Sequence, residues 1–563
     1  TSPGSRNTPL LYAAEASGLE VWSILDERSA GFFALGTAQA TGLPAIVACT
    51  SGSAAANVHP AVVEADEAGV PLVVLTSDRP PELRGIGAGQ TIDQMKLYGA
   101  AVRWFSEVGT HDADDAGLLH YRATACRAYA VARGEPRPGP VHLNLAWRDP
   151  LGGEDRPGDV SATSTLALEG RGERPLTAVS GTAPLADPAL LDELAELLSE
   201  APRGLVLAGR QTDPALAPAV VRLAEASGYP ILAEPTSQLR FGGHDRSLVI
   251  WPYDAIARVA PDELAPDLVV RFGDMPTSKA LRTWLGGLDE LRTVTIDPAF
   301  GWNEPTRKAA RIVRASASET ADGLTERLKA KGDGAGAAAA NAGWTEGWIR
   351  AAEGAAEVIA TGLSSLDEPS EPGVHSELPH LYEDGDLVYT ASSMPIRDQE
   401  AFAAGGPAAV RFLCNRGANG IDGLISSGIG AAVATGEPAW IVTGDLGLLY
   451  DAAGLGALKR AAAPVRIVVL NNDGGGIFEF LPQAGEVDRD EFEALFATPA
   501  GLDLATLAEL YGIAHQRISS LEELGAAANR TGIIEIPIER SKNTAIHRDL
   551  SDAVAGSLRA RHT

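Results

Sequence analysis

Two apolar segments that end abruptly in polar residues constrain the fold of this chain most strongly. Residues 439–442 run into Gly444 and Asp445, and residues 465–470 run into an Asn-Asn-Asp triplet followed by three glycines. Such segments are typical of buried parallel strands. The interval between Asp445 and Asn472 fits one right-handed crossover through a helix. Because ligands bind at the carboxyl edge of an open α/β sheet, we predict a ligand site at these two strand ends.

The residues at this predicted edge suit a hard cation and a phosphate. Asp445 offers a carboxylate, Asn472 an amide oxygen and Gly474 a backbone carbonyl. Magnesium takes oxygen ligands of this kind together with substrate phosphates, and manganese is accepted as readily. Taken singly, the two halves are better explained as a helix-capping aspartate and an Asn-Asp-Gly turn. Their combination on two buried strands favours a cation and phosphate site.

Length, charge and cysteine content limit the classes of protein. A chain of 563 residues is too long for one core and predicts about three domains. The net charge of −28 argues against nucleic acid or an anionic membrane as a partner. The 3 cysteines form no CxxC pair, which argues against a disulfide framework or a thiolate zinc site and predicts a reducing, cytoplasmic compartment. No apolar run approaches the ~20 residues of a membrane span.

Apolar strands alternate with helical stretches along the chain, which predicts three doubly wound parallel-sheet α/β domains. We place the domains at residues 1–152, 185–328 and 346–563, with linkers at 153–184 and 329–345. The second linker includes a low-complexity run that we expect to be a loop. Thr1 to Arg6 reads as a strand-to-helix loop with no strand before it, so we expect that a segment precedes it.

The predicted strands are short and apolar and are bounded by polar or small residues. A helix is expected over residues 190–198. The strands are predicted at residues 21–25, 45–48, 71–76, 141–145, 204–208, 230–233, 268–272, 293–296, 387–389, 410–413, 440–442, 467–470 and 533–536.

The paired strand-end motifs resemble those of a known family. Gly-Asp followed at this interval by Asn-Asn resembles the metal and diphosphate motif of thiamine-diphosphate enzymes. GDL at 444–446 and NNDGGGIF at 471–478 are similar to the SEPHCHC (2-succinyl-5-enolpyruvyl-6-hydroxy-3-cyclohexene-1-carboxylate) synthases of menaquinone biosynthesis. The resemblance implies pyrimidine-binding, central and diphosphate-binding domains, in that order. It also implies thiamine diphosphate as cofactor and Mg²⁺ or Mn²⁺ bound by Asp445, Asn472 and Gly474.

Further positions take cofactor roles through this resemblance. The family uses the glutamate of a DER motif to protonate the cofactor's aminopyrimidine, so that the neighbouring nitrogen becomes the base. Glu27 in DER at 26–28 inherits that role, although alone it would be read as a helix-start charge. Small residues after a strand, including Ser51, indicate either tight packing or cofactor contact. Ile421 matches the residue that holds the cofactor bent, or else is a core isoleucine. The other implied cofactor positions are Gly444, Leu446 and Ile477.

Basic residues at predicted strand ends indicate acidic substrates. Arg6 lies in the loop at the start of the sequence, Arg79 follows a predicted strand, Arg397 shares a strand-to-helix turn with Ser393, and Arg416 lies in a glycine-rich loop. Any one arginine would more often form a surface ion pair. Together, in so acidic a chain, they predict bidentate binding of a dicarboxylate or tricarboxylate.

The resemblance names the substrates as 2-oxoglutarate and isochorismate. It implies a transferase that decarboxylates the first and adds the succinyl unit to the second. Gln90 and Lys279 fall at substrate positions of the family, and Phe478 and Leu481 would form an apolar wall with Ile477, though an amphipathic helix start also explains these three. Gln90, Ser393 and Arg397 would be catalytic alongside Glu27.

The chain departs from the family pattern at two of these motifs. Gly89 replaces an asparagine and Ala280 an arginine, and Arg282 would compensate for the positive charge lost at Ala280.

The resemblance also implies an oligomeric assembly, and two alternative functions compete with the one it implies. The family's active site lies between the first domain of one chain and the last domain of another, which implies a homodimer or homotetramer. One rival is another thiamine-diphosphate carboligase or decarboxylase, which the arginine set disfavours. A second rival is a non-catalytic cofactor-binding regulator. The middle domain has no GxGxxG after a strand, which gives no support for a dinucleotide site there and leaves an effector site open.

Overall fold

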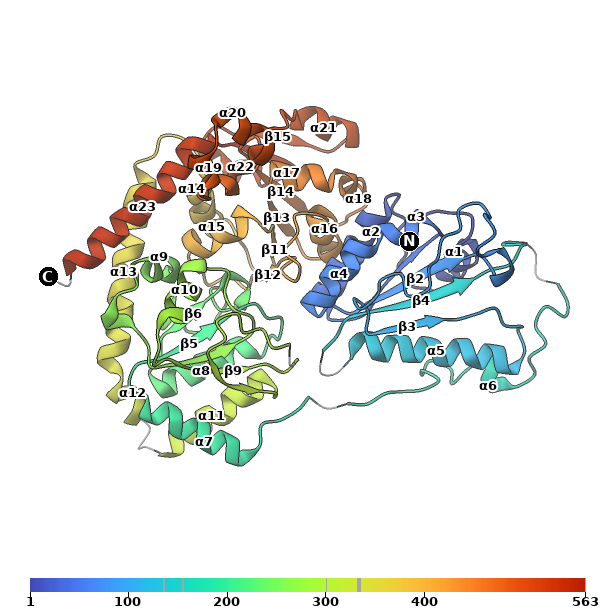
Figure 1. The fold of residues 1–563 in the computed structure, drawn as a ribbon, viewed down its shortest axis with the longest axis horizontal. Helices are drawn as coiled ribbons and strands as arrows, with labels where there is room; N and C mark the ends of the chain where they lie inside the picture. The colour runs from blue at the N-terminus through green and yellow to red at the C-terminus, as the bar shows by residue number, and fades with distance from the viewer. Residues whose placement is uncertain (135–136, 154–155, 182, 300, 332–335, 562–563) are drawn as a thin grey trace. The chain divides into compact units, whose positions relative to one another are not determined.

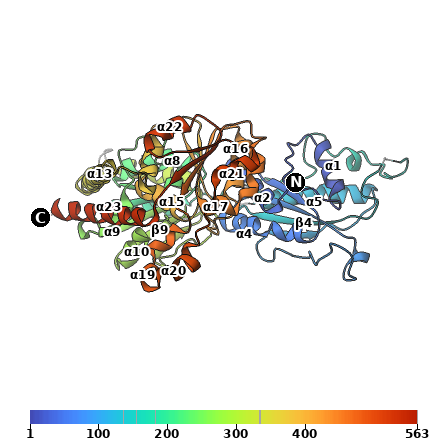
Figure 2. The same cartoon turned by 90° about the horizontal axis from the view of Figure 1, so that it is seen from above.

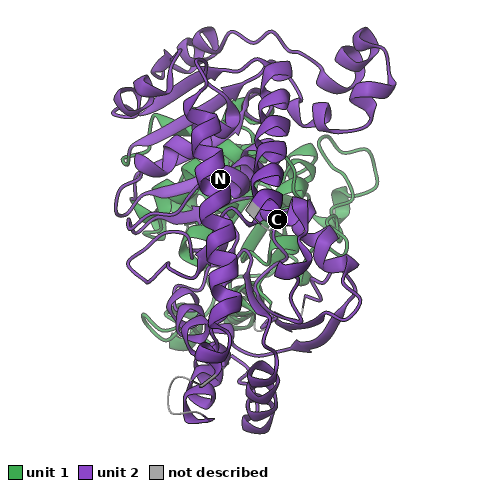
Figure 3. Cartoon of the chain, turned by 90° about the vertical axis from the view of Figure 1, so that its left-hand side faces the viewer, with its two compact units in different colours: residues 1–182, 415–436, 450–463 green, residues 183–414, 437–449, 464–563 purple. Residues whose placement is uncertain are grey.

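The computed structural model describes residues 1–134, 137–153, 156–181, 183–299, 301–331 and 336–561. The chain divides into two compact units, coloured separately in Figure 3. Unit 1 contains residues 1–182, 415–436 and 450–463, and unit 2 contains residues 183–414, 437–449 and 464–563. Three parallel sheets flanked by helices confirm the predicted α/β class. The three domain boundaries remain predictions.

Unit 1 is built on a parallel sheet with strand order β1-β2-β4-β3. The long helix α5 runs along this sheet (Figure 1), and its Ala128 and Ala132 pack against Val141 and Leu143. Three of the predicted strands are confirmed here. The strands are β1 (Ala45–Cys49), β2 (Leu72–Asp78), β3 (Trp104–Glu107) and β4 (Pro140–Ala146).

The predicted strand at residues 21–25 is wrong. Among the described residues, its backbone pairs with Thr1: the Thr1 amino group donates to the Trp22 carbonyl oxygen at 2.7 Å, and the Ile24 N–H donates to the Thr1 oxygen at 2.8 Å. One paired residue does not make a ladder, so residues 21–24 carry no strand.

Helices α2 and α16 of unit 1 approach each other closely at two glycines. A Cβ added at Gly36 of α2 would lie 1.9 Å from the Ser427 oxygen of α16, and one at Gly430 would lie 2.1 Å from the Phe33 oxygen. Only glycine permits this approach of two helices. The helices are α1 (Thr8–Ala16), α2 (Glu27–Thr41), α3 (Ser53–Asn57), α4 (His59–Ala68), η1 (Pro81–Leu83), α5 (Asp115–Arg133), α6 (Thr165–Leu168), α16 (Leu424–Thr435), η5 (Ala452–Gly454) and α18 (Leu455–Leu458).

Unit 2 contains two six-stranded parallel sheets. Their orders are β10-β9-β8-β5-β6-β7 and β12-β11-β13-β14-β16-β15. The remaining predicted strands are all confirmed. The strands are β5 (Gly204–Ala208), β6 (Ile231–Ala233), β7 (Val249–Ile250), β8 (Leu268–Phe272), β9 (Arg292–Ile296), β10 (Ala309–Val313), β11 (Leu387–Thr390), β12 (Arg411–Leu413), β13 (Ala439–Gly444), β14 (Val465–Asn471), β15 (His515–Arg517) and β16 (Gly532–Pro537).

Helices cover these two sheets, and the predicted helix at 190–198 is confirmed within α7. Helix α17 starts in unit 2 and ends at its boundary. The helices are α7 (Pro188–Glu200), α8 (Leu216–Ser227), η2 (Pro235–Ser237), α9 (Tyr253–Val259), η3 (Asp262–Leu264), α10 (Lys279–Gly287), α11 (Ala317–Lys331), α12 (Gly336–Ala340), α13 (Ala342–Ser364), α14 (Glu371–Glu377), η4 (Leu378–His380), α15 (Met394–Phe402), α17 (Asp445–Tyr450), η6 (Gly476–Phe480), α19 (Gln483–Glu486), α20 (Arg489–Phe492), η7 (Glu493–Ala497), α21 (Leu504–Tyr511), η8 (Leu521–Glu523), α22 (Leu524–Ala527) and α23 (Arg540–Arg561).

The loop expected around residues 329–343 is wrong for its described part. Helix α11 continues to Lys331, α12 covers Gly336–Ala340, and α13 begins at Ala342; residues 332–335 lie outside the described part. Alanine has the highest intrinsic helix propensity, so an alanine-rich run folds as helix once it has a packing surface. Asn341 supplies an anchor, because its Nδ2 donates to the Ser227 oxygen at 2.9 Å. The other linker, 153–184, is irregular where described, apart from α6.

Helices α13 and α23 lie side by side in both views (Figures 1 and 2). Trp348, Ala355 and Ile359 of α13 share one core with Leu550 and Val554 of α23. Within the part of the chain that the structure describes, no helix combines the length and the apolar character needed to cross a membrane.

A buried arginine links strand β6 of one sheet of unit 2 to helix α15, and its removal should destabilise the fold. Arg240 is 2% exposed, and its guanidinium donates to the carbonyl oxygens of Ala233, Trp251, Gln399, Glu400 and Ala403. We expect Arg240→Met to lower the free energy of unfolding by at least about 3 kcal/mol, because each buried acceptor left unsatisfied costs roughly 1–3 kcal/mol. Urea unfolding followed by circular dichroism measures the change.

The matched control for this prediction is Arg203→Met. Arg203 pairs with Asp267 at 2.5 Å, and both side chains are well exposed. Loss of a surface pair costs less than about 1 kcal/mol. Equal urea midpoints for the two variants would show that the hydrogen bonds of Arg240 between β6 and α15 do not stabilise the fold.

Candidate functional site

The two polar strand ends of unit 2 meet as predicted. Strands β13 and β14 are parallel neighbours, with Gly444 opposite Leu470. Asp445 therefore emerges beside the loop that follows β14, and its Oδ2 accepts a hydrogen bond from the Gly474 N–H at 2.8 Å. The connection between the strands is helical, through α17, η5 and α18. Asp445 is 2% exposed, and burial raises the pKa of its carboxyl to about 6.

Asn472 presents an unpaired oxygen at this edge. Its Nδ2 donates to Glu371 Oε1 at 2.8 Å, whereas its buried Oδ1 has no hydrogen-bond partner among the described residues. Buried polar atoms are nearly always satisfied, so a lone acceptor indicates a ligand that supplies the missing interaction. A carboxylate and an amide oxygen at one edge fit a divalent cation. Sequence reasoning missed Glu371, which lies far from both motifs in the chain.

The glycines after Asn472 are required by the backbone. Gly474 has φ +135°, and a Cβ there would lie 2.3 Å from the Ala497 oxygen. A Cβ at Gly476 would lie 2.6 Å from Asn472 Nδ2. The bare main chain at this turn suits a phosphate, which needs close approach of backbone N–H groups. The predicted apolar residues follow in and after η6: Ile477 and Phe478 are half-buried, and Leu481 is 41% exposed.

A third strand of the same sheet brings Ser393 to this edge. Strand β11 is the parallel neighbour of β13, with Thr390 opposite Val442. Ser393 follows at the start of α15 with φ +75°, a conformation that a side chain rarely adopts and that often marks functional positions. The exposed Arg397 donates through Nη1 to the Ser393 oxygen. Gly444 and Leu446, at the end of β13 and start of α17, are both half-buried.

Lys279 lies on a helix that follows a strand of the other sheet of unit 2. It is exposed as the first residue of α10, after β8. Strand β8 belongs to a different sheet from strands β13 and β14, which carry the strand-end site. Ala280, at the departure from the family pattern, packs partly against the core, and Arg282 is half-buried two positions further along the same helix.

In unit 1, three predicted residues form a hydrogen-bonded group. The Arg79 guanidinium donates to Ser51 Oγ and, at 3.1 Å, to the Gln90 carbonyl oxygen. Gln90 Nε2 in turn donates to the Ser51 oxygen at 3.0 Å. Burial, and then the charge of nearby Arg6, lower the pKa of Arg79. Four sequence-predicted side chains are therefore gathered at one place, and two of them are cationic.

Glu27 is half-buried at the first position of α2. Asn57 Nδ2 donates to its Oε2 at 3.4 Å, and Asp26 caps the helix by accepting from the Arg28 N–H at 2.9 Å. Ile421, also half-buried, comes just before α16, the helix that packs against α2. Both predicted cofactor residues thus lie close to the amino ends of two helices that contact each other in unit 1.

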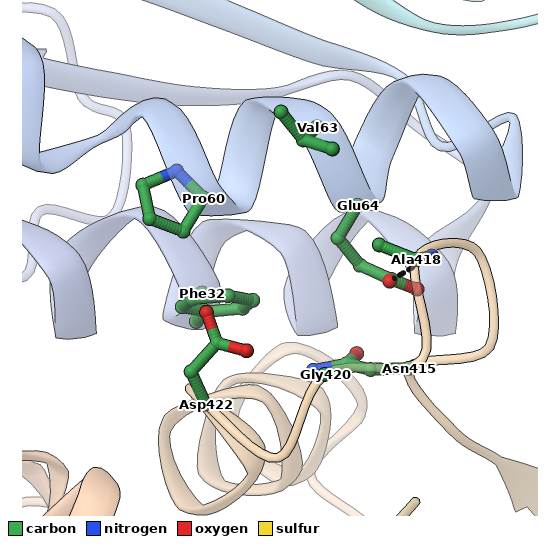
Figure 4. A pocket seen from close by; sticks show the side chains of 8 residues that line it. All are labelled: Phe32, Pro60, Val63, Glu64, Asn415, Ala418, Gly420 and Asp422. Atoms are coloured by element: carbon green, nitrogen blue, oxygen red, sulfur yellow. Dashed lines mark hydrogen bonds between the residues drawn. The ribbon is translucent and has the colours of Figure 1, made fainter.

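The loop that carries Arg416 and Ile421 is held by a carboxylate that sequence reasoning missed. Glu64 of α4 is 3% exposed and accepts from the N–H groups of Gly417 and Ala418, both at 2.7 Å. Figure 4 shows the bond to Ala418. Helical periodicity was the available signal, since it puts Glu64 on the buried face of α4. The loop borders a cavity of about 240 Å³ lined by Phe32, Pro60, Val63, Glu64, Asn415, Ala418, Gly420 and Asp422.

A second missed carboxylate ties α2 to α16. Asp451 accepts hydrogen bonds from Ser29 Oγ at 2.9 Å and from Ser426 Oγ at 2.8 Å. It also accepts from the Ser426 N–H at 2.6 Å. No motif in the sequence marks this residue, because its partners lie far away along the chain.

Comparison with known proteins agrees with this geometry. Residues 1–97 match the model of the thiamine pyrophosphate enzyme N-terminal TPP binding domain, and residues 410–533 match that of the C-terminal TPP binding domain. The fold is thus that of a thiamine pyrophosphate enzyme.

The whole chain aligns with one group of these enzymes. It is 41% identical to the 2-succinyl-5-enolpyruvyl-6-hydroxy-3-cyclohexene-1-carboxylate synthase of Myxococcus xanthus, over 99% of this chain and 94% of that protein. The synthase of Chloroflexus aurantiacus is 42% identical, over 99% and 93% of the two chains. That of Haloarcula marismortui is 41% identical, over 99% and 95%. The chain belongs to this synthase family, as its motifs predicted.

Proposed function

We propose that the protein is the transferase that decarboxylates 2-oxoglutarate and adds the succinyl unit in 1,4 fashion to isochorismate. The product is 2-succinyl-5-enolpyruvyl-6-hydroxy-3-cyclohexene-1-carboxylate, an intermediate of menaquinone biosynthesis. The proposal rests on sequence identity: this chain is 41% and 42% identical, over 99% of its length, to two synthases of this name. The unpaired Asn472 oxygen beside Asp445 supports the cofactor part of it.

Asp445, Asn472 and the Gly474 carbonyl would hold Mg²⁺ or Mn²⁺, and the cation would in turn hold the diphosphate of the cofactor. The bare backbone from Gly474 to Gly476, with Gly444 and Leu446 opposite, would line the phosphate positions. Ser51, Ile421 and Ile477 complete the proposed cofactor set. Thiamine diphosphate, when bound, supplies the carbon nucleophile that a 2-oxo acid needs to lose CO₂.

Glu27 is the proposed proton-transfer residue. Its carboxyl would exchange a proton with the ring nitrogen of the cofactor's aminopyrimidine, which is general acid–base catalysis at a fixed position. Asn57 holds one carboxylate oxygen by a hydrogen bond of 3.4 Å and so limits the rotation of the side chain.

Arginines and polar residues would orient the two acids. Arg6, Arg79 and Gln90 are gathered in unit 1, and a guanidinium binds a carboxylate through two parallel hydrogen bonds. The remaining proposed substrate residues are Lys279, Ser393, Arg397, Arg416, Phe478 and Leu481, of which Phe478 and Leu481 would face the isochorismate ring. Gln90, Ser393 and Arg397 are proposed to act in the chemical step.

We further propose that the protein works in the cytoplasm as a homodimer or homotetramer. The acidic chain, whose 3 cysteines form no disulfide, supports a reducing compartment. Light scattering coupled to size-exclusion chromatography measures the assembly directly.

One incubation tests the proposed reaction. Purified protein is given Mg²⁺ or Mn²⁺, thiamine diphosphate, 2-oxoglutarate and isochorismate, and both CO₂ and the adduct are quantified. We expect equal amounts of the two products. Release of CO₂ without adduct would instead identify a decarboxylase, and cofactor binding without turnover would identify a regulator.

Loss of the planar guanidinium at Arg79 should weaken the binding of one substrate selectively. We expect Arg79→Lys to raise the Michaelis constant for one of the two acid substrates by roughly 10–100-fold, because charge-assisted hydrogen bonds contribute about 1.5–3 kcal/mol. Lysine keeps the charge but not the fork geometry. Steady-state kinetics with each substrate varied in turn measures the effect.

The control for Arg79→Lys is Arg148→Lys. Arg148 lies in the same unit and pairs with Glu82 at 2.7 Å, with both side chains half exposed. Its replacement should leave both Michaelis constants unchanged. Unaltered Michaelis constants in Arg79→Lys would remove Arg79 from the substrate site.

A further inference from the structure

A buried group of acidic and imidazole side chains lies behind Asn472 in unit 2. Glu371 is 2% exposed and Asp398 1% exposed, and both lie close to His547. Glu371 Oε1 accepts from Asn472 Nδ2 at 2.8 Å, and His547 Nε2 lies 2.8 Å from Asp398 Oδ1. The proposed function uses none of these three residues.

We propose that Glu371 is a positioning residue that orients the Asn472 side-chain amide, so that the amide oxygen is presented to the cation. The inference rests on the proposed cation and diphosphate site. The two ends of an asparagine amide are nearly equal in size, so shape alone does not decide which end faces a metal. An acceptor fixed beside one end selects the NH₂ group there and leaves the oxygen for the ligand. In this structure the oxygen is the buried, unpaired atom.

Three helices fix the position of Glu371. It is the first residue of α14, after the capping residue Ser370, and its N–H donates to Asn543 Oδ1 of α23 at 3.0 Å. The same Asn543 offers its carbonyl oxygen to His547 Nδ1 at 2.8 Å. Asp398 on α15 faces the other ring nitrogen. The carboxylate beside Asn472 is therefore braced by α14, α15 and α23 rather than carried on a loop.

The group itself does not suit a second metal ion. The ligand-type atoms of Glu371, Asp398 and His547 lie within 4.8 Å of one another. Both ring nitrogens of His547, however, already face oxygen acceptors, at 2.8 Å each. With both nitrogens engaged by oxygen atoms of the protein, the ring has no free nitrogen to offer a cation. This leaves orientation of Asn472 as the role that the contacts support.

Two substitutions at residue 371 distinguish the effect of the side-chain length, which allows the hydrogen bond to Asn472, from the effect of the negative charge. Glu371→Gln keeps the side-chain length and an oxygen acceptor but removes the carboxylate. Glu371→Asp keeps the carboxylate but withdraws it from Asn472 by one methylene. Mn²⁺ titrations in the presence of thiamine diphosphate, read by electron paramagnetic resonance of free Mn²⁺, give the affinity of each full-length variant without any turnover.

We expect Glu371→Gln to bind Mn²⁺ nearly as tightly as the unchanged protein and Glu371→Asp to bind it about 10–100-fold more weakly, the usual cost of losing a residue behind a metal ligand. The opposite order would overturn the proposal, since it would show that the negative charge matters and not the hydrogen bond. Equal affinity in all three proteins would also overturn it. Where Glu371→Asp does not fold, Glu371→Met, which keeps length without an acceptor, replaces it with the same expectation.

Glu400→Asp is the matched control. Glu400 is equally buried at 2% exposure in the same unit, and its carboxylate accepts from the Tyr253 hydroxyl rather than from a residue of the strand-end site. Its shortening should lower the melting temperature and leave the Mn²⁺ affinity unchanged. Failure of the unchanged protein to bind Mn²⁺ with thiamine diphosphate would contradict the cation site itself. Normal binding there with no loss in Glu371→Asp would contradict only the positioning role.

Discussion

Glu27→Gln is expected to lower kcat by about 10²–10⁴-fold, the range that a positioned proton-transfer group contributes. Glutamine fills the same space and keeps an acceptor for Asn57 but carries no exchangeable acid proton. The affinity for thiamine diphosphate should change little, because the proposed diphosphate and cation contacts are made by Asp445, Asn472 and Gly474. Single-turnover decarboxylation of 2-oxoglutarate, together with cofactor titration by tryptophan fluorescence, separates the two effects.

Glu20→Gln provides the comparison for Glu27→Gln. Glu20 is an exposed carboxylate in the same unit whose Oε1 accepts from Trp22 Nε1 at 2.8 Å, a bond that glutamine preserves. It should leave kcat unchanged. If Glu27→Gln kept half of the original turnover, proton transfer by this carboxyl would be excluded.

Asp445→Asn is expected to weaken Mn²⁺ and thiamine diphosphate by more than about 100-fold, since loss of a ligand exceeds the 10–100-fold typical of the residues behind it. The amide retains one oxygen but lacks the negative charge that a hard cation favours. Activity should fall in parallel and should recover in part at high metal and cofactor concentrations. Titration of both ligands, followed by kinetics at saturation, measures the loss.

Asp473→Asn separates ligation from local charge. Asp473 lies in the same turn but is exposed, and it accepts from the Gly501 N–H at 2.8 Å. Asparagine tolerates its positive φ of 51°. This variant removes one negative charge beside the site without removing a proposed ligand, so its affinities should stay near normal. Equal losses in the two variants would indicate an electrostatic effect of the turn and no coordination by Asp445.

The predicted strands that the structure confirms are apolar runs, whereas the missed strands β3 and β15 are rich in polar residues and the missed strand β7 is only two residues long. The four missed strands, β3, β7, β10 and β15, all lie at sheet edges. Edge strands bury less of their surface, so residues such as His515 and Arg517 of β15 are accepted there. The wrong strand at 21–25 shows the converse: an apolar stretch remains irregular where only one residue pairs with it.

The sequence by itself determined the α/β class and the polar strand ends at Asp445 and Asn472, because period, length and turn chemistry are local properties of the chain. It also indicated Ser51, Arg79 and Gln90, but only as separate motifs. The tertiary structure alone decided which buried carboxylates hold the loops and helices of the predicted sites in place. Glu64, Glu371 and Asp451 are buried carboxylates whose partners lie far along the chain. Helical periodicity can place Glu64 on a buried face, but the long-range hydrogen bonds of all three carboxylates arise only when helices and sheets pack, so no local pattern records their partners.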